Sequence, residues 1–124
     1  MRANSILLDL PWPPSVNHYY RHVGPRVLIS REGRKYRKRI CALLDISNPP
    51  ALAGGIEVSI DAFPPDLRRR DLDNLQKSLF DSLQYAGVFK DDSQIHKFTI
   101  TRQAVCRPNG KIIVALSPLE GPTG

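Results

Sequence analysis

Two aspartates, Asp71 and Asp73, have the types and spacing expected of a metal site. They lie at the junction between an extended segment and a predicted helix, where two short carboxylates can converge. Lys77 follows four residues after Asp73 and shares its helix face. Converging carboxylates repel one another and raise each other's pKa, and a divalent cation removes that cost. Oxygen ligands without histidine or cysteine favour Mg²⁺, with Mn²⁺ as its expected substitute, over zinc.

A second acidic pair, Asp91 and Asp92, follows the same predicted helix and would reach the first pair only if the next strand runs alongside that helix. A metal held by such carboxylates lowers the pKa of a bound water and stabilises the charge that develops on a phosphorane. A neighbouring lysine or arginine adds to that stabilisation. The pattern therefore predicts hydrolysis of a phosphodiester.

The same residues also have a structural explanation. Aspartates near a helix N-terminus are favoured by capping and by the helix dipole, and Lys77 could simply pair with Asp73 or with Asp81. Three arginines directly before Asp71 favour the metal site, because they would place phosphate-binding groups beside it. Spacing alone leaves both explanations open.

Basic residues are concentrated in one part of the chain. The 124 residues contain 18 Lys and Arg against 12 Asp and Glu, a formal charge of +6. Residues 21–39 hold eight Lys and Arg and one acid, which favours a polyanionic partner, either nucleic acid or an anionic membrane surface. A solvated helix face and ordinary turn chemistry are the alternatives. The candidate DNA contacts are Asn17, Tyr20, Arg21, Arg34, Lys35, Lys38, Arg68, Arg69 and Arg70.

Several other classes of protein are disfavoured. No apolar run approaches the roughly 18 residues that a membrane span requires, and the N-terminal apolar stretch, interrupted by Asp9, is too short for a secretory signal. Cys41 and Cys106 lack CxxC spacing, so we expect small buried or half-buried side chains in a reducing, cytoplasmic setting. We expect no small-molecule cofactor and no membrane partner.

Hydrophobic periodicity predicts the elements that must position these residues. Strands are expected over residues 6–10, 27–29, 56–60, 97–105 and 111–116, with residues 107–110 as the hairpin turn that joins the last two. Helices are expected from the Ser30 cap to about residue 45 and over residues 71–86. The expected fold is one α+β domain over residues 1–124, a mixed sheet covered by two main helices, with a flexible tail over residues 117–124.

The chain resembles the RusA-type Holliday junction resolvases, small endonucleases of bacteria and prophages. The most specific match is the Asp-Leu-Asp-Asn-Leu-Gln-Lys motif of residues 71–77, which follows three arginines. A Pro-Trp-Pro-Pro motif at residues 11–14 and the acidic pair at residues 91–92 also match. The likeness spans residues 10–95 in the same order and at compatible spacing.

This resemblance implies a homodimer of mixed α/β fold that needs Mg²⁺ and makes paired, symmetric nicks across a four-way DNA junction in recombination and repair. The family's metal-binding carboxylates carry over to Asp71, Asp73 and Asp92, with Asp91 in reserve, and its catalytic lysine carries over to Lys77. Two other functions stay open. One is a non-catalytic DNA-binding module whose aspartates only cap a helix, and the other is a metal-dependent nuclease for flaps, forks or RNA.

Overall fold

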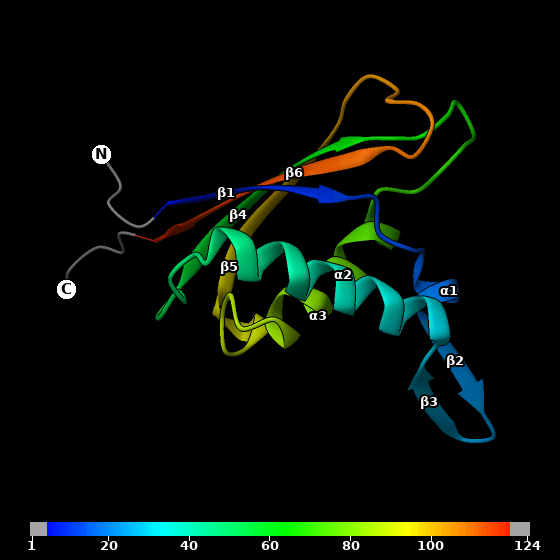
Figure 1. Ribbon diagram of the computed structural model, residues 1–124, viewed down its shortest axis with the longest axis horizontal. Coiled ribbons are helices and arrows are strands. Elements are labelled where there is room, and N and C mark those ends of the chain that lie inside the picture. The colour runs from blue at the N-terminus through cyan, green and yellow to red at the C-terminus, as the bar shows by residue number, and fades with distance from the viewer. Residues whose placement is uncertain (1–4, 120–124) are drawn as a thin grey trace.

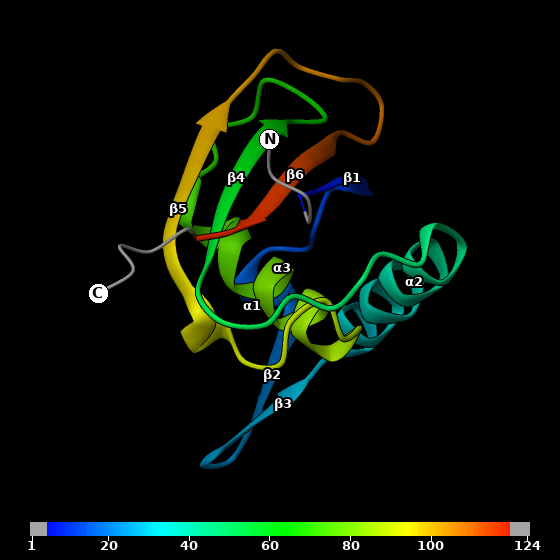
Figure 2. The same ribbon diagram turned by 90° about the vertical axis from the view of Figure 1, so that its left-hand side faces the viewer.

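A four-stranded mixed sheet and two long helices form the body of the protein (Figure 1). The computed structural model describes residues 5–119. The sheet has the order β1-β6-β4-β5, with strands β1 Ile6–Pro11, β4 Ile56–Phe63, β5 Ile95–Arg102 and β6 Lys111–Pro118. The long helices are α2 Arg31–Ser47 and α3 Asp73–Tyr85, and both cover the same face of the sheet (Figures 1 and 2). The expected α+β fold with a mixed sheet and two main helices is therefore confirmed.

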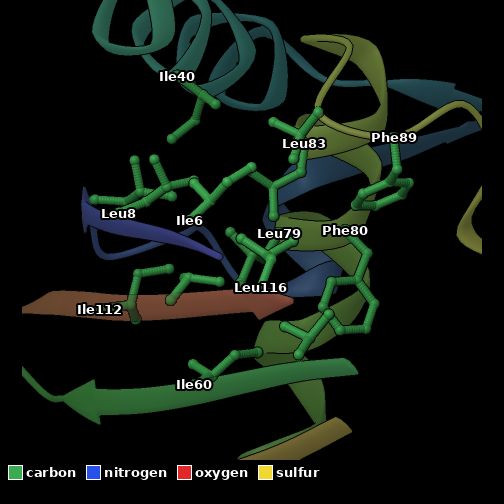
Figure 3. Packing of buried hydrophobic residues seen from close by; sticks show 14 of the residues in the cluster. Ile6, Leu8, Ile40, Ile60, Leu79, Phe80, Leu83, Phe89, Ile112 and Leu116 are labelled. Carbon is green, nitrogen blue, oxygen red and sulfur yellow. The ribbon is translucent and has the colours of Figure 1, made fainter. Parts of the chain in front are cut away.

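Alternating side chains place the hydrophobic core between this sheet and the helices. In β4 the residues Ile56, Val58 and Ile60 are fully buried, because successive side chains of a strand point to opposite faces. Figure 3 shows Leu79 and Leu83 of α3 packed over the strands of the sheet. The predicted leucine stripe of the second helix is thus the face that forms the core.

The two long helices begin differently. Ser30 caps α2 as expected, and its Oγ accepts a hydrogen bond of 3.0 Å from the N–H of Gly33. The helix ends at Asn48, whose φ of 46° lies in the left-handed region. Helix α3 begins two residues later than predicted, after Leu72, and no side chain caps it.

The connection between the last two strands differs from the prediction. Residues 107–110 form a turn, but the strands on either side of it are not partners, so the predicted hairpin is wrong. β5 pairs in parallel with β4, and β6 lies between β4 and β1, antiparallel to both. The reason is burial: Ile112 and Val114 of β6 are fully buried, as a central strand requires, whereas β5 is largely exposed and suits an edge.

Residue boundaries near the C-terminus also differ. β5 ends at Arg102, three residues earlier than predicted, and the N–H of Gln103 makes the last bond to β4, at the carbonyl of Ala62. Ser117 and Pro118 belong to β6 rather than to the expected tail, and residues 120–124 lie outside the described residues. Cys41 and Cys106 are free and half-buried, as expected. Within residues 5–119, no helix is long and apolar enough to cross a membrane.

A two-stranded ribbon projects from the body beneath the helices (Figures 1 and 2). It consists of β2 Tyr20–Val23 and β3 Arg26–Ile29, and a single helical turn, α1 Val16–Tyr19, leads into it. Only the second of these strands was expected from the sequence. The base of the ribbon packs closely on α2 at Gly33, where an added Cβ would collide with the Tyr19 carbonyl oxygen and lie 2.7 Å from Ile29 Cγ1.

Gly33→Ala is therefore expected to destabilise the protein, although alanine is the better helix former. Relieving the collision must shift backbone, and overpacking of this kind costs about 1–3 kcal/mol of unfolding free energy. Urea unfolding measures the change, with the exposed neighbour substitution Glu32→Ala as the control that stays close to wild type. A Gly33→Ala variant as stable as wild type would contradict the described packing.

Candidate active site

An open cleft of about 750 Å³ lies beside the start of α3. One wall is the Pro-Trp-Pro-Pro segment with His18, and the other holds Asp71, Asn74 and the three arginines before them. The first wall is held in place by two side chains that bond to its carbonyl groups: the Tyr36 hydroxyl donates to the carbonyl of Pro11 at 2.8 Å, and Ser78 Oγ donates to that of Pro14 at 2.8 Å. The proline-rich motif thus builds one side of the cleft.

The aspartates of the motif do not serve the fold. Helix α3 has Leu72 at its N-cap and no side-chain cap hydrogen bond, so neither Asp71 nor Asp73 caps it. Both side chains are exposed, and neither carboxylate accepts a hydrogen bond or forms an ion pair with any residue in 5–119. Helix capping by these aspartates, which the spacing alone left open, is therefore not observed. Asp73 still benefits from the positive end of the helix dipole in the first turn.

Lys77 is also free of ion pairs within the described part of the chain. Its ammonium group lies 5.6 Å from the centre of the Tyr20 ring, within the range of a cation–π interaction. Such a contact orients the ammonium group without neutralising it. The alternative pairs of Lys77 with Asp73 or Asp81 do not form.

Two neighbouring acids are held by arginines instead. Arg70 donates to Asp66 Oδ1 at 2.7 Å, and this bond, with the N–H of Arg68, lowers the pKa of Asp66 to about 2. Arg37 donates to Asp81 Oδ2 at 2.6 Å. Arg70 thus serves the fold as well as the cleft, while Arg68 and Arg69 are exposed.

The two residues of the second acidic pair, Asp91 and Asp92, have different roles. Asp91 caps a short 3₁₀ helix, η1 Asp92–Gln94, by accepting a hydrogen bond from the N–H of Ser93, which holds the pKa of Asp91 below its ordinary value. The Asp92 carboxylate has no such task. Its backbone N–H bonds to Gln84 Oε1 at 3.1 Å, near the C-terminal end of α3.

The Gln84 side chain that this N–H contacts belongs to the opposite end of α3 from Asp71 and Asp73. Gln84 follows Asp73 by eleven residues, a rise of about 16 Å along an α-helix. Burial raises the pKa of Tyr20, and the charges of Asp81 and, to a smaller extent, Asp92 add to that rise.

No group of three His, Cys, Asp or Glu side chains among residues 5–119 is arranged to hold a metal ion. The structure places Asp71 in the cleft and Asp73 in the first turn of α3 beside it, but Asp92 does not join them in a metal-binding group. This set still fits Mg²⁺, because that ion usually takes one or two carboxylates and completes its shell with waters and substrate phosphate oxygens. It does not fit an all-protein cage.

A basic groove of about 590 Å³ runs along α2. Predicted contacts Arg34, Lys35 and Lys38 line it together with Arg31 and the C-terminal residue of α3, Tyr85. Lys35 also lines a smaller hollow with Arg39, and that hollow shares its Trp12, Pro13 and Pro14 wall with the cleft. The hollow thus shares lining residues with both the cleft and the groove. Of the other predicted contacts, Asn17 and Arg21 are exposed and Tyr20 is half-buried.

A buried hydrogen-bond network was not foreseen from the sequence. Tyr19, the first of two adjacent tyrosines, is fully buried. Its hydroxyl accepts a hydrogen bond from Arg37 Nε at 2.9 Å and donates one to Asp81 Oδ2 at 2.5 Å, and Ser82 Oγ lies 3.1 Å away. This network joins α1, α2 and α3. The tandem tyrosines were the available signal, but nothing in the sequence says which of the two is buried.

Tyr19 makes the free energy of unfolding fall as the pH becomes alkaline. Burial, followed by the hydrogen bond to Asp81, raises its pKa from 10.0 to about 12. The stabilisation is complete below the unfolded-state value and is lost as the pH rises from about 10 through about 12, because only the unfolded chain ionises freely there. In urea unfolding over this range, Tyr19→Phe should lose less stability than wild type. The exposed Tyr85→Phe should follow wild type, and equal slopes for all three would contradict this role of Tyr19.

The sequence pattern of the family described as endodeoxyribonuclease RusA matches residues 11–117. The Escherichia coli K12 protein named crossover junction endodeoxyribonuclease RusA is 42% identical over 109 residues, 84% of this chain and 88% of the relative. The relative of that name from Enterobacteria phage 82 matches with the same identity and coverage. One from Escherichia coli O139:H28 is 39% identical over 121 residues, 94% of this chain and 97% of the relative. Since the match includes the cleft, the lysine and the basic groove, the chain belongs to the endodeoxyribonuclease RusA family.

Proposed function

We propose that this protein is a Mg²⁺-dependent, structure-specific endodeoxyribonuclease that resolves four-way DNA junctions by paired, symmetric nicks during recombination and repair. Membership of the family and the names of its bacterial and phage relatives support the reaction class. The structural observation that carries the proposal is that the Asp71 and Asp73 carboxylates and the Lys77 ammonium group form no ion pair within residues 5–119, while three arginines line the cleft together with Asp71. The compartment we propose is the bacterial cytoplasm.

Each residue of the proposed active site has a role in this proposal. Asp71 and Asp73 would hold Mg²⁺, which when bound supplies an activated water and stabilises negative charge. Lys77, oriented by the Tyr20 ring, donates hydrogen bonds to the phosphate that undergoes attack. Arg68 and Arg69 bind the phosphates on either side. Water attacks phosphorus and the bond to the 3′ oxygen breaks, which leaves 5′-phosphate and 3′-hydroxyl ends.

Asp92 has a less direct role in the proposal. It does not cap η1, because Asp91 performs that role, and its side chain interacts with that of Asp91. We propose that it acts with the other carboxylates in metal binding once junction DNA is bound. Substitution of Asp92 should therefore be tested in the same cleavage assay as substitutions of Asp71 and Asp73.

A homodimer is the proposed acting form. A two-fold axis presents two identical sites, which suits cleavage of two junction strands of like polarity. The groove on α2 would bind the DNA backbone beyond the cleft, because Arg31, Arg34, Lys35 and Lys38 give it positive charge.

The reaction is tested with end-labelled synthetic DNA in Mg²⁺, in Mn²⁺ and in EDTA. Symmetric nicks in the four-way junction alone, and only with metal, would support the proposal. Equal cleavage of flaps, forks or RNA would replace it with a broader nuclease, and binding without cleavage in any divalent ion would favour a non-catalytic module. All substrates must be compared at one salt concentration, because salt sets the apparent affinity.

Asp71→Asn should lower junction cleavage by at least about 10²-fold, the order of magnitude for the loss of a major electrostatic contribution to catalysis. Junction binding in EDTA should stay intact or improve, because repulsion of the phosphates falls. Asp9→Asn, an exposed aspartate on β1, is the matched control and should cleave at the wild-type rate. Wild-type cleavage by Asp71→Asn would refute the site assignment.

Lys35→Gln and Lys38→Gln should each reduce the salt dependence of junction binding. The slope of log affinity against log salt falls by about one for each lost phosphate contact. Lys97→Gln is the control. Lys97 lies on β5, and its Nζ is 3.6 Å from Oε2 of Glu57 on the neighbouring strand β4. Slopes that match wild type would mean that the groove on α2 is only a solvated helix face.

A further inference from the structure

The β2–β3 ribbon exposes apolar side chains that the core does not use. Val23 is 43% exposed, Val27 57% and Leu28 38%, and all three lie in the ribbon that projects from the body (Figure 1). A two-stranded ribbon is only marginally stable by itself. Because the apolar side chains near its tip stay exposed, they do not stabilise the fold by burial. Exposed apolar side chains on a projecting element suggest a binding partner.

The root of the ribbon is held firmly, in contrast to its tip. Tyr20 and Ile29, which face each other at the root, are half-buried and pack against the core. The N–H of Ser30 donates to the carbonyl of Tyr19 at 2.8 Å, and Ser30 Oγ donates to the carbonyl of His18. Because Tyr20 also contacts the Lys77 ammonium group, the ribbon extends outward from the catalytic lysine in a fixed direction.

Strand register defines two faces of the ribbon. Arg21 lies opposite Leu28 and Val23 lies opposite Arg26, so one exposed face alternates guanidinium groups with apolar side chains. On the other face, His22 lies opposite Val27 beyond the root. No acidic residue occurs between positions 20 and 29. The ribbon is therefore complementary in charge to a polyanion.

We infer that the ribbon enters the branch point of the junction, where Val23 and Val27 contact the faces of unstacked bases and Arg21 and Arg26 bind the flanking phosphates. This inference rests on the proposed function and adds a means of recognising the branch. Apolar side chains at the tip suit base faces, as in proteins that insert wedges between base steps.

The test uses four-way junctions that carry 2-aminopurine, either at the branch or in the middle of one arm, with the full chain in EDTA so that binding is separated from cleavage. Wild type should raise the fluorescence at the branch and not in the arm. A Val23→Ser/Val27→Ser double variant should lose most of that rise. It should also lose about tenfold of its preference for the junction over linear duplex, the order expected when the burial of about one aliphatic side chain is lost.

Matched variants keep the test decisive. Val23→Ile/Val27→Ile, which stays apolar and β-branched, should retain the signal, and Ile46→Ser, which removes an 84% exposed side chain from α2, should behave as wild type. Unchanged fluorescence and unchanged junction preference in the serine variant would overturn the inference. Sedimentation would overturn it as well if the serine variant changed from dimer to monomer, because the ribbon would then contact a second copy. Absence of cleavage by wild type in Mg²⁺ would be a failure of the proposed function alone.

Discussion

The Arg37–Tyr19–Asp81 network is the constraint on which the rest of the site depends. It is the point where α1, α2 and α3 meet, and its bonds join residues far apart in the sequence. Tyr19 directs the chain into the ribbon, and its neighbour Tyr20 meets Lys77. A polar network of this kind inside a helical layer fixes one arrangement, since any other would leave a buried hydroxyl or charge without a partner.

Arginines decide which acids remain available for chemistry. Asp66 and Asp81 are paired with Arg70 and Arg37, and Asp91 is occupied as a cap, whereas Asp71 and Asp73 have no arginine partner within residues 5–119. Arg70 also lines the cleft that is proposed to hold phosphate, together with Arg68 and Arg69. A chain with +6 net charge thus keeps a small acidic centre inside a cationic surface, and substrate phosphates can approach it because the surrounding field attracts them.

Local sequence patterns predicted the helices and strands, whereas the order of the strands and several contacts of the site depend on pairing between distant segments. Alternation in residues 56–60 and helical spacing of the leucines after Asp71 foretold β4 and α3, because both patterns reflect one buried face. The turn at residues 107–110 suggested a hairpin, but strand order is chosen by burial across the whole sheet. Likewise, spacing identified Asp71, Asp73 and Lys77, whereas the separation of Asp92 from them and the burial of Tyr19 depend on contacts between distant segments.

The central position of β6 has a consequence for how the molecule forms. β1 and β4 do not pair with each other; each pairs with β6, the last of the described strands. A nascent chain that has made only its first hundred residues therefore carries β1 without a neighbour, and one edge of β4 stays open. Sheet closure joins residues more than a hundred positions apart in the case of Ile6 and Leu116. Such long-range pairing slows folding, and exposed strand edges in the waiting chain are sites for association between copies.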